Sequence, residues 1–254
     1  MRFSDFIANN HVFTAQSLRK KMSNGSSAQV ALSRAVASGK VAKVRSGLYV
    51  SGSGRFQGVK ADPHLVAATL RPGAVFVLHS ALVLHGLAHS ISNTIQCMTH
   101  TRFAPFSFDG VTFISMPFRE RALTEALTAS AYGAIRVTTR EQTLVDCLAT
   151  ISSAGGTEEV LCSFSGLPYA DVDTILTCLN AYPPSVASRV GWYLEMNQER
   201  WAVPDEVLST IESKISRQAS YKLDPKIKAS EAYSARWRLS LPASVDTLSD
   251  WMGR

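Results

Sequence analysis

The sequence predicts an α+β protein with two domains, the first over residues 1–54 and the second, larger one over residues 55–254. Three observations lead to this prediction. Basic residues are concentrated in the first sixty positions, the local patterns there indicate short helices followed by a β-hairpin, and the segment Ser51–Gly54 has the Ser/Gly composition of a flexible linker. We therefore expect two units with different tasks.

The composition is that of a folded protein without a membrane-spanning segment. Of 254 residues, 46% are hydrophobic and 18% are charged, and no uninterrupted apolar stretch approaches the roughly 18–20 residues that cross a bilayer. Met1–Asp5 carries no apolar signal-peptide core, which predicts a cytoplasmic protein. Four cysteines stand far apart without a C-x-x-C pair, which favours small buried hydrophobes over a disulfide framework or a zinc ribbon. We expect no cofactor.

Three short helices are predicted in the first domain. They span Phe3–Asn9, Ala15–Met22 and residues 26 to about 38. Thr14 is a suitable N-cap for the second helix, and Ser23–Gly25 is typical of a turn. The S-x-x-Q spacing of Ser26–Gln29 is that of a capping box and opens the third helix.

A hairpin follows the third helix. Two β-type runs, Lys40–Arg45 and Leu48–Ser51, are joined by Ser46-Gly47, a pair with the chemistry of a tight turn. The order helix, helix, turn, helix, hairpin is that of a winged helix-turn-helix. The second domain is expected to be mixed α+β and to end in a helical bundle.

The third predicted helix has two different faces. At about 100° per residue, Ala28, Leu32 and Ala35 share the face that would pack on the first two helices. The opposite face carries small and hydroxyl side chains, with Arg34 able to reach a guanine edge or a phosphate, which suits a helix lying deep in a major groove. The same serines also suit ordinary solvated positions, and Gln29 suits the capping box better than a base contact.

Charge is distributed unevenly along the chain. Residues 1–60 hold ten basic groups against one acid, a net charge of +9, whereas the remaining 194 residues carry −3. A concentrated positive field favours a polyanion, and double-stranded DNA is the expected partner rather than a membrane, because the basic residues surround short helices instead of flanking an apolar face. The predicted DNA-contacting residues are Arg19, Lys20, Lys21, Ser26, Ser27, Gln29, Val30, Ser33, Arg34, Lys40, Lys43 and Arg45.

The second domain alternates between helical and β-type patterns. Helices are expected over residues 62–70, 80–87 and 140–150, and in a helical stretch from Glu158 to about Ile215. Strands are expected at Thr94–Thr99, Phe106–Phe108, Val111–Met116, Ile135–Val137 and Trp237–Leu241. Asp109-Gly110 is a strong turn signal between the second and third of these strands.

Two groups of residues resemble catalytic or metal sites. His85 and His89 are four apart, the spacing at which a helix points both side chains at one metal, but Gly86 lies between them and no carboxylate follows. We therefore expect packed or turn-capping histidines, His79 included.

Four large aromatic residues could form a partner-binding patch, although core packing is the default expectation for Trp192, Tyr193, Trp201 and Trp237.

The second group resembles the sequence motif of metal-dependent nucleases. Pro204-Asp205 followed by Glu212 and Lys214 supplies the carboxylates and lysine that such enzymes gather around a divalent cation. The apolar spacing of the same stretch is helical, however, with Pro204 and Asp205 at its start. A capped surface helix is the better interpretation.

Three segments together resemble the AbiEi antitoxin family. Arg45–Tyr49 is similar to its R-x-G-x-Y wing ending, His79–Leu87 to its S-A-x-x-x-H-G-L signature, and Val137–Asp146 to its E-R-T-L-x-D segment, with Gln142 in place of the usual arginine. The likeness covers about residues 5–200 and fades in the last fifty. Gln142 in place of the family's arginine puts in doubt the contact that this arginine makes, but it does not put the fold in doubt.

The resemblance implies a function beyond what composition indicates. It implies a winged-helix repressor that binds inverted repeats in its own promoter, with a larger C-terminal domain that opposes a nucleotidyltransferase-like toxin without a stable complex. No catalytic residue belongs to the family pattern, so the resemblance implies a protein that is not an enzyme.

Two other classes of function stay open. One is a nuclease or toxin-modifying enzyme delivered to its target by the N-terminal domain, with Asp205, Glu212 and Lys214 as the first candidate residues. The other is a repressor whose second domain binds a metabolite.

Overall fold

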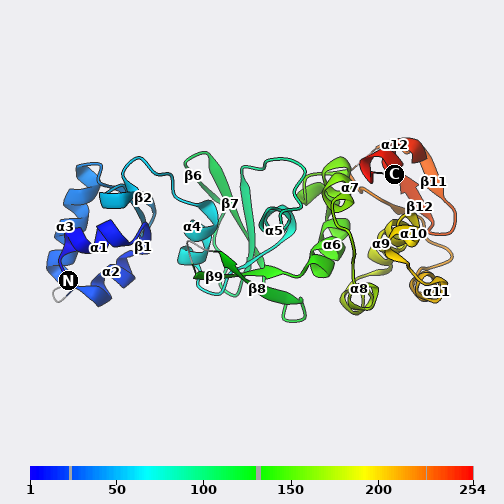
Figure 1. The fold of residues 1–254 in the computed structure, drawn as a ribbon, viewed down its shortest axis with the longest axis horizontal. Coiled ribbons are helices and arrows are strands. Elements are labelled where there is room, and N and C mark those ends of the chain that lie inside the picture. The colour runs from blue at the N-terminus through cyan, green and yellow to red at the C-terminus, as the bar shows by residue number, and fades with distance from the viewer. Residues whose placement is uncertain (23–24, 130–132, 227, 254) are drawn as a thin grey trace.

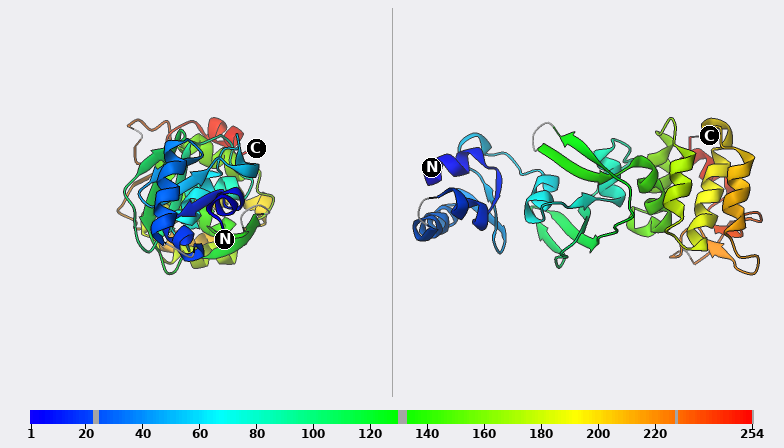
Figure 2. Two further views of the ribbon diagram at one scale, coloured as in Figure 1. Left: turned by 90° about the vertical axis from the view of Figure 1, so that its left-hand side faces the viewer. Right: turned by 90° about the horizontal axis from the view of Figure 1, so that it is seen from below.

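The computed structural model describes residues 1–22, 25–129, 133–226 and 228–253. The chain is α+β, as expected, and it is elongated. Three units follow one another along the long axis: an N-terminal unit, a sheet unit and a helical unit (Figure 1; Figure 2, right). We define them as residues 1–58, 59–139 and 140–253.

The N-terminal unit packs three helices on a small sheet. Its elements are α1 (Phe3–Asn9), β1 (Val12–Thr14), α2 (Ala15–Lys21), α3 (Gly25–Ala37), β2 (Val41–Arg45), β3 (Leu48–Ser51) and η1 (Gly54–Phe56). The strand order is β1-β3-β2, antiparallel throughout. The three predicted helices and the hairpin are present, whereas β1 was not predicted because it has only three residues. Buried side chains of α1, α2 and α3 form the core, including Phe6, Leu18 and Leu32.

Helix starts in this unit follow local side-chain chemistry. The Thr14 hydroxyl accepts from the Ser17 amide at 3.0 Å and the Ser17 hydroxyl accepts from the Thr14 amide at 3.1 Å, which confirms the predicted N-cap of α2. α3 begins at Gly25, so Ser26 lies inside its first turn rather than before it, and the predicted capping box is not the start of the helix. The predicted turn at Ser23–Gly25 lies mostly outside the described residues.

The segment predicted as a flexible linker, Ser51–Gly54, is packed instead. A Cβ on Gly54 would lie 2.9 Å from the Cβ of Ala8, so glycine permits a close approach to α1. Directly after it, the Phe56 ring stacks on His11 with centroids 4.3 Å apart. The chain therefore leaves the N-terminal unit along its surface rather than through a free tether.

The sheet unit is built on one mixed sheet. Its elements are α4 (Pro63–Leu70), β4 (Val75–Phe76), α5 (Leu78–Leu84), β5 (Thr94–Thr99), β6 (Phe106–Phe108), β7 (Val111–Pro117), β8 (Thr124–Ala129) and β9 (Gly133–Thr138). The strand order is β6-β7-β5-β4-β9-β8, with β5/β7 and β4/β9 parallel and the other pairs antiparallel. Asp109 and Gly110 both have positive φ, 50° and 78°, which confirms the predicted turn.

The helical unit follows the sheet directly. Its elements are α6 (Arg140–Ala149), η2 (Ile151–Ser153), α7 (Thr157–Ser165), α8 (Val172–Leu179), α9 (Pro184–Met196), α10 (Gln198–Trp201), α11 (Asp205–Ser213), α12 (Val245–Trp251) and the short strands β10 (Tyr221–Lys222), β11 (Ala232–Ser234) and β12 (Leu239–Leu241). The large aromatic residues predicted as core are buried: Trp192, Tyr193, Trp201 and Trp237. No helix within the described ranges is long and apolar enough to cross a membrane.

Apolar cores run across both boundaries between units. Leu48 and Val50 of β3 belong to the same buried cluster as Phe76 and Val137 of the sheet. Met98 of the sheet belongs to the large cluster of the helical unit. Three of the four cysteines are fully buried, as expected, and burial raises the pKa of Cys97 to about 12.

Candidate nucleic-acid interface

The exposed face of α3 is the one that the sequence assigns to DNA. Ala28, Leu32 and Ala35 are buried against the other helices. The remaining side chains of this helix that were predicted to contact DNA are all exposed: Ser26, Ser27, Gln29, Val30, Ser33 and Arg34. Val30 is 52% exposed and adds an apolar side chain to this face. α3 lies at the end of the molecule farthest from the sheet and helical units (Figure 1).

Exposed cations lie on the two elements that flank α3. Arg19, Lys20 and Lys21 form the last turn of α2, where positive charge also complements the helix dipole. Lys40 and Lys43 are exposed before and within β2. The Arg19 guanidinium donates to the Gln29 side-chain oxygen at 3.0 Å, a bond that joins α2 to α3. Gln29 therefore links two helices, a contact that the sequence did not indicate.

Arg45 lies elsewhere. Its guanidinium carbon is 4.8 Å from the ring centroid of Phe106 and 5.8 Å from that of Phe103, both in the sheet unit, so it makes cation–π contacts between two units. The cause is a β-bulge in β2: Lys43 pairs with Tyr49, but Arg45 pairs with Leu48. An inserted residue breaks the alternation that placed Lys43 and Arg45 together in the sequence prediction.

The three histidines in and just after the second motif segment, His79–Leu87, have different surroundings. The His85 ring donates from Nε2 to the carbonyl oxygen of Thr138 at 2.7 Å and so fastens the end of α5 to β9. His79 is buried beside Glu159, with 3.1 Å between Nε2 and Oε1. His89 is exposed. Within the described part of the chain, no group of three or more His, Cys, Asp or Glu side chains is placed to hold a metal ion.

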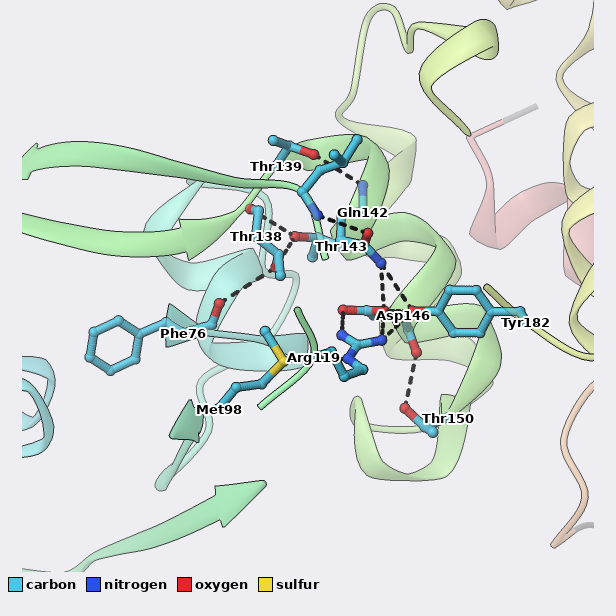
Figure 3. Close-up of polar contacts among 11 residues, drawn as sticks. Phe76, Met98, Arg119, Thr138, Thr139, Gln142, Thr143, Asp146, Thr150 and Tyr182 are labelled. Carbon is cyan, nitrogen blue, oxygen red and sulfur yellow. Dashed lines mark hydrogen bonds and ion pairs between the residues drawn. The ribbon is translucent and has the colours of Figure 1, made fainter. Parts of the chain in front are cut away.

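A polar network surrounds Asp146 in the third motif (Figure 3). Gln142 and Asp146 lie one turn apart on α6, and the Gln142 amide donates to Asp146 at 2.9 Å and to the Tyr182 hydroxyl at 3.0 Å. Arg119, from the loop after β7, donates two hydrogen bonds to the Asp146 carboxylate. Tyr182 also donates to that carboxylate. The guanidinium that faces Asp146 therefore comes from Arg119, and residue 142 supplies an amide.

Charge and burial fix the protonation states in this network. Burial lowers the pKa of Arg119, but the hydrogen bonds and charge of Asp146 more than offset it and the pKa is raised. Burial and the adjacent carboxylate raise the pKa of Tyr182. Arg119 thus stays charged and Tyr182 stays a neutral donor at neutral pH, which keeps the sheet unit fastened to α6 and the α8–α9 loop.

The three residues of the nuclease-like motif, Asp205, Glu212 and Lys214, contact separate partners. Asp205 accepts from Gln198 at 2.7 Å, and Lys214 donates to Asn180 at 3.1 Å. Glu212 accepts from Arg236 at 2.9 Å. The predicted helix is present as α11, with Pro204 as its N-cap residue. The three side chains do not share a partner that would gather them around one cation.

Comparison with known proteins gives a likeness of fold. No protein-family model matches the chain, and no curated protein matches it. The structure is similar to one titled "Crystal structure of RV2827C protein from Mycobacterium tuberculosis", with a TM-score of 0.69 and 15% sequence identity over 100% of this chain and 94% of that one. The likeness spans all three units, and at this identity it shows the fold alone.

Proposed function

We propose that this protein is a sequence-specific DNA-binding transcriptional repressor whose N-terminal unit is a winged helix. Two helices in sequence, α2 and α3, precede a hairpin, and β1 completes a three-stranded antiparallel sheet with that hairpin. In this proposal α3 enters the major groove and the cations on either side of it hold the phosphates.

The exposed face of α3 carries the proposal. Its serines are small enough for the helix backbone to approach the bases, and Val30 offers an apolar surface to a thymine methyl group. Arg34, in the last turn, is long enough for a guanine edge. Five exposed basic side chains surround these positions: Arg19, Lys20, Lys21, Lys40 and Lys43.

We further propose that the repressor is an antitoxin of the AbiEi kind, acting on inverted repeats in its own promoter. This part rests on the three motif segments noted above. The second and third of them are in contact, because His85 bonds to the Thr138 carbonyl and Thr138 belongs to the third segment. The proposed opponent is a nucleotidyltransferase-like toxin with which no stable complex forms.

DNA binding is tested with the full chain and fluorescence anisotropy. The probe is a labelled duplex from the region upstream of the gene, and the competitor is a shuffled duplex of equal length and composition. We expect the upstream duplex to bind at least tenfold more tightly at the same salt concentration, a difference of about 1.4 kcal/mol. Equal affinity for both duplexes would contradict sequence-specific repression.

Antitoxin action needs a separate test in cells. The adjacent gene is expressed from an inducible promoter with this protein, with Arg34→Ala or with an empty vector. We expect the protein and Arg34→Ala to restore growth equally, while only the unaltered protein represses a promoter fusion. Rescue that disappears with Arg34→Ala would mean that antitoxin action requires the DNA-contacting face of α3, which contradicts two separate activities. A harmless neighbouring gene would remove the antitoxin part of the proposal.

A further inference from the structure

A cavity of about 570 Å³ lies in the sheet unit where it meets the helical unit, away from the proposed DNA face. Its walls come from α5, β5, β7, η2 and the segment before β5. The lining residues are His79, Ser90, Ile91, Ser92, Asn93, Thr94, Gln96, Ile114, Met116, Ser152, Ser153 and Gly155. The volume falls within the roughly 300–1,000 Å³ that is usual for small-molecule sites.

One buried residue in this wall lacks the hydrogen bonds that buried polar groups usually make. The His79 side chain is 5% exposed, and neither of its ring nitrogens forms a hydrogen bond among the described residues. Nε2 lies 3.1 Å from Oε1 of Glu159, a side chain that is 6% exposed. Nε2 thus faces a carboxylate, and both ring nitrogens are buried, so the imidazole belongs to the polar framework behind the cavity wall.

Glu159 is held in place from the other side. Its Oε1 accepts from the backbone amides of His89 at 3.1 Å and Ser90 at 3.3 Å, and from the Ser163 hydroxyl at 3.0 Å. Gly155 lies against it: a Cβ there would meet the Glu159 Cγ at 2.6 Å, and the φ of Gly155 is +113°. The carboxylate that faces His79 is therefore held in place behind the cavity wall.

The polar wall is also fixed. The Gln96 amide oxygen accepts from the His79 backbone at 3.2 Å, and its amide nitrogen donates to the Ser153 carbonyl at 2.8 Å. The Ser152 hydroxyl donates to Asp224 at 2.7 Å, which leaves its oxygen lone pairs as acceptors. This part of the cavity is preorganised by contacts within the protein.

The lining selects a chemical class of ligand. Seven of the twelve lining residues carry a hydroxyl or amide side chain, and none is Lys, Arg, Asp or Glu. An anion would find no fixed cation in that lining, and an aromatic base would find no aromatic side chain to stack on. Ile91, Ile114 and Met116 supply aliphatic surface for C–H groups. A ligand hydroxyl both donates and accepts hydrogen bonds, so it suits a wall of hydroxyl and amide groups.

We propose that this cavity binds a small uncharged polyhydroxylated molecule, such as a free monosaccharide or cyclic polyol, through the hydroxyl and amide side chains of its wall. The site is independent of the DNA face and adds a small-molecule ligand to the proposed repressor.

The test uses saturation-transfer NMR and calorimetry on the full chain. The neutral probes are D-ribose, D-glucose and myo-inositol, and the charged counterparts are D-ribose 5-phosphate, D-glucuronate and D-glucosamine. Ser153→Trp fills the cavity from an exposed wall position, and Ser209→Trp makes the same change on the exposed surface of α11.

We expect at least one neutral probe to bind, and its binding to disappear in Ser153→Trp and to persist in Ser209→Trp. Thermal unfolding of each variant shows whether it is folded. Binding of the charged counterparts alone, of none of the neutral probes, or of a neutral probe unaffected by Ser153→Trp would overturn the proposal.

Discussion

Two cations on the same strand, Lys43 and Arg45, are predicted to behave differently on DNA. Each phosphate that a protein neutralises contributes about −0.9 to the slope of log affinity against log salt concentration. With five exposed cations beside α3 assigned to phosphates (Arg19, Lys20, Lys21, Lys40 and Lys43), the expected slope is about −4.5, or about a five-hundredfold loss of affinity between roughly 50 and 200 mM salt. Lys43 is exposed and belongs to this set, whereas Arg45 stacks on Phe106.

The substitutions Lys43→Ala and Arg45→Ala separate these roles. Lys43→Ala should reduce the magnitude of the slope by about 1 and weaken binding to all sequences alike. Arg45→Ala should leave the slope unchanged and lower the free energy of unfolding by about 1 kcal/mol, because it removes cation–π contacts at a half-buried site. The assay is fluorescence anisotropy over a series of KCl concentrations, with urea denaturation for stability.

Arg121→Ala is the matched control, since it removes one exposed positive charge outside the N-terminal unit. Its slope should equal that of the unaltered protein. If Arg45→Ala reduced the slope as much as Lys43→Ala, Arg45 would have to leave the aromatic rings when DNA binds, and its assignment to the contact between units would be wrong. A slope near zero for the unaltered protein would refute the phosphate contacts altogether.

Three further predictions concern base contact, pH and packing. Arg34→Ala should cost about 1–3 kcal/mol on the preferred duplex and relax sequence preference at one position, measured by competition with single-base variants; a uniform loss would contradict a base contact. Hydrogen bonds from Ser90 and Ser163 outweigh burial and hold the pKa of Glu159 below its ordinary value of 4.5, so Glu159→Gln should lower stability by about 1.5 kcal/mol at neutral pH. That difference is present above about pH 4.5 and shrinks as the pH falls through the folded-state pKa; urea midpoints between pH 3 and 7 check it. Gly191→Ala should cost about 3 kcal/mol, because the new Cβ would lie 2.0 Å from the buried Trp237 ring, whereas Gly166→Ala meets nothing closer than 3.8 Å and should be nearly neutral in calorimetry.

Local signals in the sequence predicted most of the elements correctly. The Thr14 cap, the turn at Asp109-Gly110 and the hairpin turn at Gly47 depend on a few neighbouring residues, and each has the predicted conformation. β4 has two residues, too few for a pattern to indicate a strand, although it pairs with strands on both sides in the sheet. Strand pairing between distant segments creates such an element, and local patterns do not contain it.

Contacts between distant segments account for what the sequence did not predict in the site. The mismatch at Gln142 was visible, but the guanidinium that faces Asp146 comes from Arg119, which is 27 positions away from it. The stacking of Arg45 depends likewise on Phe106 and on a bulge that period-two alternation cannot indicate. By contrast, the exposed face of α3 follows from helical periodicity alone, and the structure places those side chains at the surface.

The shared cores determine how the DNA-binding proposal has to be tested. An isolated fragment of residues 1–54 would leave out the sheet residues that bury Leu48 and Val50, and the rings that stack on Arg45. Each buried aliphatic side chain that becomes fully exposed costs roughly 1.5–3 kcal/mol of folding free energy. For so small a unit this is a large fraction of its stability. Failure of that fragment to bind DNA would therefore report its unfolding as readily as the absence of a recognition helix. Substitutions in the exposed face of α3 within the full chain leave these buried contacts intact, so they test recognition itself.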